Sequence, residues 1–364
     1  MNNTTVLRIA ALDIVRGIAI LGTLWTNIWI FTDYDGFLGA TNATPPLLES
    51  FIVSLSQGKF LALLSLLFGI GMAIQFESAV RRQLPWPGRY LRRMLLLLID
   101  GALNYIFIAE FDILMGYAVT GFVVAFLLAK TPKIRKRVLI LATSVHLLLM
   151  TAAALALEFV EEPESEPLPT PYATGSYAEL IAFRIENIFF FRAEPLFIFP
   201  LTVALFLLGA KLYHAGILQP DKTQLRKRLL ILGTIAFPID IAFGTFGTFG
   251  MVFIERYVIA PFVALGLLAL IINCCHRFNT NALPARLLSS VGRCALSCYL
   301  LQNLLGMLIF YGVGLGLVNY IQSWHVSATI LGYIVIASLV SAFAHFWMKR
   351  FRHGPAEWVW KQLG

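Results

Sequence analysis

Charged side chains are scarce in this sequence of 364 residues. Only 13% of the residues are Asp, Glu, Lys or Arg, whereas 59% are hydrophobic. Soluble domains carry about 25% charged and 45–50% apolar residues. A soluble core could not bury this much apolar side chain, and a disordered chain would contain far less of it. The composition therefore excludes both classes and indicates a polytopic membrane protein.

Cysteine is also scarce, and familiar catalytic motifs are lacking. The four cysteines lie close together in the sequence, at positions 274, 275, 294 and 298. Their spacing does not match a zinc site, and we expect them to be reduced packing residues. The sequence contains no HxxxD, GxSxG, Walker or CxxC motif. We therefore expect no metal, and none of these motifs indicates an enzyme.

Apolar runs of roughly 20 residues, the length that crosses a bilayer as a helix, recur along the whole chain. We identify about ten of them: 12–31, 52–76, 94–109, 113–129, 138–157, 196–217, 229–249, 257–275, 294–318 and 328–348. Arg16 falls inside the first run and a second run follows shortly, so we expect a retained span rather than a signal peptide. The sequence predicts an all-α helix bundle formed by one domain, residues 1–364.

Lys and Arg are concentrated in alternate loops. The basic loops contain Arg81, Arg82, Arg89, Arg92, Arg93, Lys130, Lys133, Arg135, Lys136, Arg137, Lys222, Arg226, Lys227, Arg228, Arg277, Arg286 and Arg293. Cytoplasmic loops carry such an excess, so we predict ten spans with both termini in the cytoplasm. The formal net charge of +8 then reflects sidedness and not a nucleic-acid partner.

The intervening loops are acidic or neutral. The longest of these loops and the C-terminal tail each contain a segment that differs in composition from the apolar runs. The longest outer loop, 158–194, contains a Pro/Glu stretch at 161–167, which is typical of a solvated segment. The following segment, Tyr177–Phe191, predicts an amphipathic helix at the outer interface. Residues 349–364 predict an amphipathic cytoplasmic tail.

Polar residues inside the first span form a stripe. Asp13, Arg16, Thr23 and Asn27 are separated by three, seven and four residues, so they share one helix face. Ionisable groups inside a membrane are costly and are candidates for function. The alternative is an Asp13–Arg16 pair that anchors the helix end by snorkelling.

Further polar groups lie in other spans. Lys59 lies below the outer surface, and we expect it either to snorkel outward or to pair with Asp112 or Glu110. The other candidates are Asp100, Asn104, Asp240, Arg293, Ser297, Tyr299, Gln302 and Asn303. They predict a central polar cavity from Arg16 and Arg293 on the inner side to Lys59 and Asp112 on the outer side. The alternative is a set of interhelical hydrogen bonds.

Several short segments form a recognisable set, in order along the chain. The first is the run from Leu12 to Gly22, which contains Asp13-Ile14-Val15-Arg16-Gly17. The others are Gly58-Lys59-Phe60, Leu67-Phe68-Gly69, Asp112-Ile113-Leu114 with Tyr117 and Gly121, Val291-Gly292-Arg293 with Leu296, Tyr299 and Gln302, and the tail Gly354–Trp360. Together these segments resemble the YeiB-like family of bacterial membrane proteins, a domain of unknown function (418).

The family is similar to the transmembrane acyltransferases, which include the acyltransferase-3 proteins and the lysosomal heparan glucosaminide acetyltransferase. This resemblance implies an acyl-CoA-type donor bound from the cytoplasmic side, with Arg16 either in contact with its phosphate or orienting the reacting groups. The related groups carry histidines where this chain has Asn27 and Asn104. An amide is not a general base, so a carboxylate would have to replace them.

The sequence thus predicts an acyltransferase-like protein of the bacterial inner membrane. Asp112 and Asp100 are the candidate bases, with Asn104 beside them, and the transfer would go to a hydroxyl or amine at the outer side. The side chains expected to bind the donor or a lipid head group are Asp13, Arg16, Asn27, Lys59, Arg293 and Gln302. The alternative is a transporter or lipid-handling protein without chemistry. Membrane lipids are the expected partners, and a homodimer is left open.

Overall fold

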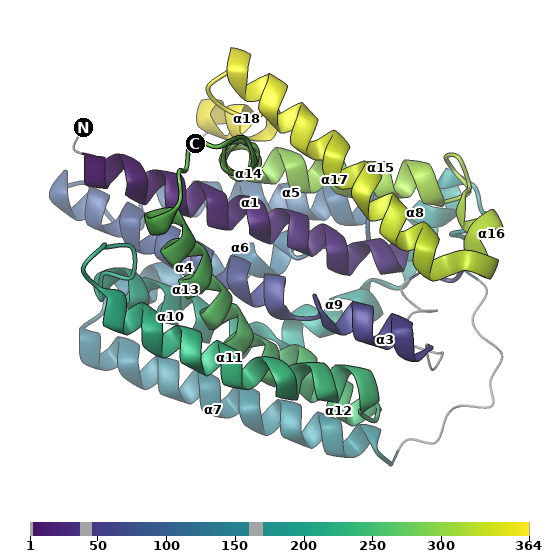
Figure 1. Cartoon of the computed structure of the whole chain (residues 1–364), viewed down its shortest axis with the longest axis horizontal. Helices are drawn as coiled ribbons and strands as arrows, with labels where there is room; N and C mark the ends of the chain where they lie inside the picture. Colours follow the sequence, from purple (N-terminus) through teal and green to yellow (C-terminus); the bar gives the residue numbers. More distant parts are fainter. Residues whose placement is uncertain (1–2, 37–45, 160–169, 364) are drawn as a thin grey trace.

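The computed structural model describes residues 3–36, 46–159 and 170–363, and these fold into a bundle of helices (Figure 1). No β-strand occurs in the described part of the chain, and the predicted all-α class is confirmed there. The Pro/Glu stretch 161–167 lies outside the described residues.

The first half of the chain contributes seven of the helices described. They are α1 (Asn3–Thr32), α3 (Leu47–Ser54), α4 (Lys59–Arg81), α5 (Arg89–Phe107), α6 (Leu114–Leu128), α7 (Pro132–Leu157) and α8 (Tyr177–Glu186). The later helices are α9 (Ile188–Phe197), α10 (Phe199–His214), α11 (Thr223–Phe246), α12 (Phe249–Ile254), the π-helix η1 (Glu255–Ile259), α13 (Ala260–Arg277), α14 (Leu283–Arg293), α15 (Ala295–Phe310), α16 (Val318–Ile321), the 3-10 helix η2 (Gln322–Trp324), α17 (His325–Arg350) and α18 (Pro355–Leu363).

Six helical segments in the described residues are long and apolar enough to cross a membrane. They are Ala10–Thr32, Leu47–Arg81, Pro132–Leu157, Thr223–Phe246, Phe249–Arg277 and Val318–Arg350. Two bent pairs, α9 with α10 and α14 with α15, raise the number to as many as eight. Each predicted run is at least partly helical. The third and fourth runs correspond to α5 and α6, of 19 and 15 residues, which pack against each other.

Two predicted spans are less regular than their apolar runs suggest. The helix of the second run is interrupted between Ser54 and Lys59, where Gly58 has a φ of 71°. A Cβ atom on Gly58 would lie 2.0 Å from the carbonyl oxygen of Arg256, so the turn and the close approach both require glycine. The run 294–318 contains a helix only to Phe310, and α14 before it makes an angle of 91° with α15.

The predicted amphipathic helix Tyr177–Phe191 is two helices. Ser176 and Glu179 form a capping box that starts α8, and α8 ends before Asn187. Then α9 leads directly into α10 at an angle of 44°. Arg184, expected at an interface, is fully buried. The segment is therefore anchored in the bundle rather than lying wholly on its surface.

Near the end of the chain, the helix α18 docks on the bundle. The Glu357 carboxylate accepts hydrogen bonds from the backbone N–H of Leu296 (2.8 Å) and from the Ser297 hydroxyl (2.5 Å) at the start of α15. The Trp360 indole N–H donates to Asp100 on α5 at 2.5 Å. The last helix thus joins the second half of α5 to the beginning of α15.

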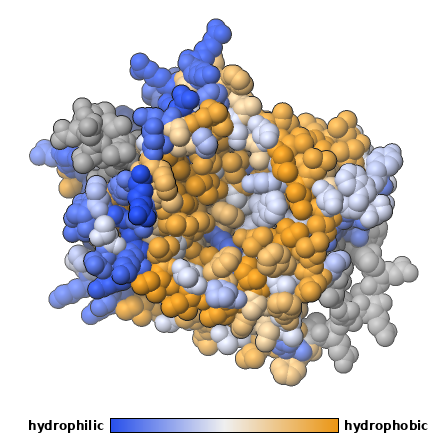
Figure 2. Space-filling model, viewed as in Figure 1, coloured by the Kyte–Doolittle hydropathy of each residue, from blue (hydrophilic) through white to orange (hydrophobic). Residues whose placement is uncertain are grey.

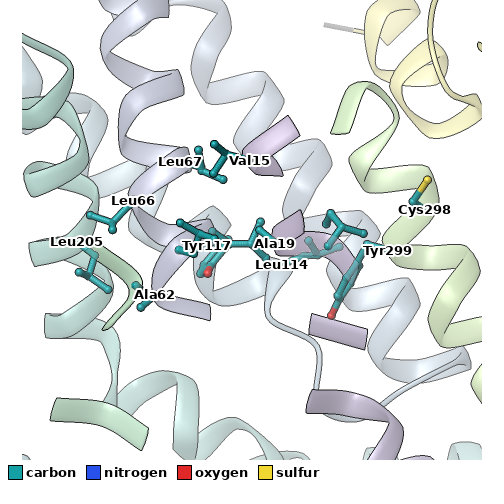
Figure 3. Packing of buried hydrophobic residues seen from close by; sticks show 14 of the residues in the cluster. Val15, Ala19, Ala62, Leu66, Leu67, Leu114, Tyr117, Leu205, Cys298 and Tyr299 are labelled. Carbon is teal, nitrogen blue, oxygen red and sulfur yellow. The ribbon is translucent and has the colours of Figure 1, made fainter. Parts of the chain in front are cut away.

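A continuous apolar core holds the central helices together. Ala19 of α1, Leu67 of α4, and Leu114 and Tyr117 of α6 belong to one buried cluster (Figure 3). On the molecular surface, hydrophobic side chains cover most of the face shown in Figure 2, whereas hydrophilic ones gather at the end where α1 begins. This distribution is the one expected for a protein surrounded by lipid.

Candidate functional site

The polar group around Arg16 lies where α1 packs against α14. Arg16 donates through Nη1 to Asp13 Oδ1 and to the carbonyl oxygen of Gly292, both at 3.3 Å. A Cβ atom on Gly292 would lie 1.8 Å from the Asp13 carbonyl oxygen, and one on Gly17 would lie 2.0 Å from that of Leu288. The two glycines let the backbones approach closely enough for Arg16 to reach α14.

A basic cavity of about 540 Å³ lies beside this crossing. Arg293 and Arg286 line it from α14, and Lys349 and His345 line it from α17. Its other lining residues are Ala10, Thr280, Asn281, Ser289, Ser290 and Met348. Arg286, Ser289, Ser290 and Arg293 recur at helical spacing, so α14 presents one polar face to the cavity. The combination of cations and hydroxyls is suited to a phosphate-bearing ligand.

A smaller cavity, of about 350 Å³, is apolar and shares three helices with the basic one. Its lining consists of Ile18, Leu21, Gly22, Trp25, Leu55, Phe60, Leu288 and Tyr333. These residues place it between α1, the interruption before α4, α14 and α17. The two cavities follow each other along α1, because Ala10 lines the basic cavity and residues between Ile18 and Trp25 line the apolar one.

Lys59 lies at the centre of a buried ion cluster. Its Nζ lies 2.5 Å from Asp240 Oδ2 and 3.0 Å from Glu255 Oε1, and it donates to the carbonyl oxygens of Ser54 (2.6 Å) and Gln57 (3.2 Å). Lys59 is 2% exposed, and Asp240 and Glu255 are 0% exposed. Three separate helical segments, α4, α11 and η1, supply the charged groups.

The predicted partners of Lys59 are wrong. Asp112 receives the amide N–H of Asn104 at 2.7 Å, and Glu110 receives Arg184 Nε at 3.2 Å, so both acids are already bonded. Asp240 was recognised in the sequence as an intramembrane acid. Glu255 was missed because it directly precedes the apolar run 257–275 and is followed by Arg256, as in a loop.

Asp112 and Asn104, which were both predicted to belong to the candidate site, are hydrogen-bonded to each other. Asp112 Oδ1 also accepts the backbone N–H of Met115 at 3.1 Å, and Arg192 donates to the Asp112 carbonyl oxygen at 3.0 Å. Asp112 is 1% exposed and Asn104 also 1%. The Tyr299 hydroxyl accepts from the Ile113 backbone N–H at 3.5 Å. This acid therefore lies in a dense, polar and nearly dry environment.

A further buried ion pair, Arg184 with Glu110, was not predicted from the sequence. Arg184 also donates to the carbonyl oxygens of Ile106 (3.3 Å) and Ile108 (2.8 Å). Its carbonyl oxygen accepts a hydrogen bond from the Tyr105 hydroxyl. The sequence signal was present, because Arg184 is one of few cations in the acidic outer loops.

The remaining predicted residues lie apart from these groups. Asp100 is bonded to Trp360 and not to Asp112. Gln302 is fully buried and donates to Thr23 Oγ1 at 3.3 Å, which joins α15 to the polar stripe of α1. Asn27 is half-buried further along that stripe. Among the described residues, no group of three or more His, Cys, Asp or Glu side chains could hold a metal ion.

The predicted polar interior is thus divided among separate clusters in the described structure. Arg16 and Arg293 lie at the α14 end, Lys59 is bonded to Asp240 and Glu255, and Asp112 is bonded to Asn104. Neither the Lys59 cluster nor the Asp112–Asn104 pair lines the basic cavity or the apolar cavity.

The fold and these buried clusters define an all-helical membrane protein with a basic cavity at one end. Residues 212–364 match the family described as "Protein of unknown function (DUF418)". The chain is 28% identical to the uncharacterized protein YxaH of Bacillus subtilis (strain 168), over 97% of this chain and 93% of that protein. It is 27% identical to the uncharacterized protein YeiB of Escherichia coli (strain K12), over 98% of this chain and 96% of that protein.

A protein of the amylase 3' region of Bacillus acidopullulyticus is also similar, with 28% identity over 98% of this chain and 93% of its own length. These matches confirm the predicted resemblance. The chain is similar to YeiB and YxaH along nearly its whole length, and its residues 212–364 match the DUF418 family model.

Proposed function

We propose that the chain crosses a bacterial cytoplasmic membrane ten times, with both termini in the cytoplasm. The six to eight candidate spans become ten if α5 and α6 also cross. The excess of Lys and Arg in alternate loops supports the direction, since cationic loops remain inside. The bacterial relatives support the compartment.

We further propose that the protein binds an acyl-CoA-type donor from the cytoplasmic side and transfers its acyl group to a hydroxyl or amine acceptor. The observation that carries this proposal is the basic cavity of about 540 Å³ between α14 and α17. Arg286, Arg293 and Lys349 supply three permanent positive charges, and guanidinium groups bind phosphate oxygens in a bidentate manner.

Asp112 is the candidate base on the acceptor side. A carboxylate can take the proton of a nucleophile, whereas the amide of Asn104 cannot. The geometry supports a positioning role for Asn104, because its N–H is bonded to Asp112 Oδ2. Such a bond orients the acid and leaves its Oδ1 on the side of Met115. Transfer would require the acceptor to reach this buried acid.

Calorimetric titration of palmitoyl-CoA into the full chain in lipid nanodiscs tests the donor site. We expect saturable binding, and at least tenfold weaker binding by the Arg293→Ala variant, since a hydrogen bond to a charged group contributes about 1.5–3 kcal/mol. Arg16→Ala tests the neighbouring cation. Arg228→Ala is the matched control, because Arg228 is exposed on α11 and does not line the cavity.

The absence of binding, or equal losses of affinity in Arg293→Ala and Arg228→Ala, would remove the donor proposal.

A second candidate function, lipid handling without chemistry, is favoured by the apolar cavity that adjoins α1, α14 and α17. In that case a diacyl phospholipid with a phosphate head group would bind in the same assay with the same dependence on Arg293. Mixtures with a hydroxyl acceptor would then yield no transferred acyl group.

A further inference from the structure

The cluster around Lys59 contains more negative than positive charge. Asp240 and Glu255 each bring a carboxylate to the single ammonium of Lys59, at 2.5 and 3.0 Å. All three side chains are 2% exposed or less. If every group were ionised, one negative charge would remain without a counterion in a buried site.

Such an excess charge is expensive away from water. The penalty for an ion in a protein interior is several kcal/mol even after relaxation, and two carboxylates that share a site tend to hold one proton between them. Asp240 Oδ1 and Glu255 Oε2 are buried, and neither has a hydrogen-bond partner among the described residues. One proton on either acid makes the cluster neutral.

Charges on the surrounding elements do not provide this compensation. Arg256, next to Glu255, is bonded to Glu194 at 2.8 Å. On α7, His146 Nε2 lies 2.9 Å from the Tyr257 carbonyl oxygen. On α3, Glu49 is paired with His325 at 3.4 Å. No titratable side chain occurs in α12, and those of α13 lie at its far end, Cys274 to Arg277. The excess negative charge therefore remains with Asp240 and Glu255.

Three irregular elements meet at the cluster. The helix is interrupted between α3 and α4, α11 contains Pro238 two residues before Asp240, and Glu255 begins a π-helix. Interrupted helices and π-turns are recurrent features of ion-binding and functional sites in membrane proteins. The interruption also borders the apolar cavity, through Leu55 and Phe60, so a modest shift of this turn would admit water.

We propose that Lys59, Asp240 and Glu255 form a proton-binding site inside the bundle, which takes up one exchangeable proton from water. The proton resides on Glu255, which is further from the ammonium than Asp240. Lys59 remains an ammonium and Asp240 a carboxylate. This site is distinct from the basic cavity and does not depend on the proposed acyl donor.

Infrared difference spectroscopy of the full chain in nanodiscs tests the proposal, because a protonated carboxylic acid has its own carbonyl stretch. We expect this band at neutral pH, a downshift after transfer to D₂O, and loss of intensity as the pH rises. Glu255→Gln and Asp240→Asn should each remove the same component, because either change leaves one carboxylate for one ammonium. Glu179→Gln is the control, since Glu179 is exposed on α8.

Lys59→Met should have the opposite effect. Without the ammonium both carboxylates lack a counterion, so the acid band should grow and persist to higher pH. A structural ion cluster with both acids ionised would give no such band in the wild type, and the acid band would first appear in Lys59→Met. A wild-type spectrum in which no acid component depends on Asp240 and Glu255, or one that does not respond to D₂O, would overturn the proposal.

Discussion

Buried cations in this protein are satisfied in two different ways. Lys59 and Arg184 each meet a carboxylate from another segment of the chain. Arg226 meets none, and instead donates to Asn273 Oδ1 and to the carbonyl oxygens of Ile217, Gln219 and Pro220. Arg226 therefore stabilises the turn before α11, whereas Lys59 and Arg184 depend on carboxylates that are remote in the sequence. Removing one partner would leave the other charged and buried.

At the residue scale, Asp33, which directly follows α1, predicts how the stability of the fold depends on pH. Burial raises the pKa of its carboxyl from 3.8 to about 6, although the Asp35 backbone N–H bonded to it lowers that pKa. An acid whose pKa is raised on folding costs stability once it is ionised. Wild-type stability should therefore fall as the pH rises through the interval between these two values.

The Asp33→Asn variant should lack this fall. Asn keeps a side-chain oxygen for the Asp35 N–H but never ionises. Above the interval we expect it to exceed the wild type in unfolding free energy by about 1 kcal/mol, with solvent screening taken into account. Thermal unfolding recorded across pH measures the difference. A difference that is independent of pH would contradict the assignment to Asp33.

At the scale of elements, the crossing of α1 and α14 positions the residues that line the basic cavity. Gly292 and Gly17 bring the two backbones together, and Arg16 then bonds to the Gly292 carbonyl oxygen. We expect Gly292→Ala to lower the unfolding free energy by about 1–3 kcal/mol, because an added methyl group in a packed contact forces the helices apart. Detergent unfolding followed by circular dichroism measures the loss.

Gly71→Ala on α4 is the matched control for this crossing. A Cβ atom on Gly71 meets nothing within 4 Å, so the change should be neutral or stabilise the helix by about 0.5–1 kcal/mol. Equal destabilisation by the two substitutions would show that the close approach at Gly292 has no special cost. A weaker affinity for the acyl donor in Gly292→Ala would further link the crossing to the basic cavity.

At the scale of the whole molecule, the apolar runs predict most of the helices, because the runs follow from local composition. The interruptions are less predictable, since they depend on tertiary contacts. Gly58 adopts its left-handed turn against Arg256, which is remote in sequence. The contact between Asp112 and Asn104 follows from a short hairpin, whereas the pairing of Lys59 with Asp240 and Glu255 requires knowing which helices are neighbours.

The proposed orientation makes a prediction for the whole chain that single-cysteine labelling can test. On a background without native cysteines, Glu179→Cys in α8 should react with a membrane-impermeant maleimide in spheroplasts. Lys130→Cys and Lys361→Cys should react only after permeabilisation, because α6 and α18 end in the cytoplasm in the proposed arrangement. All three positions are exposed, so accessibility within the protein does not limit the reaction. Labelling of Lys361→Cys in intact spheroplasts would place the tail outside. The basic cavity beside α17 would then face away from cytoplasmic acyl-CoA, and the donor proposal would fail together with the ten-span arrangement.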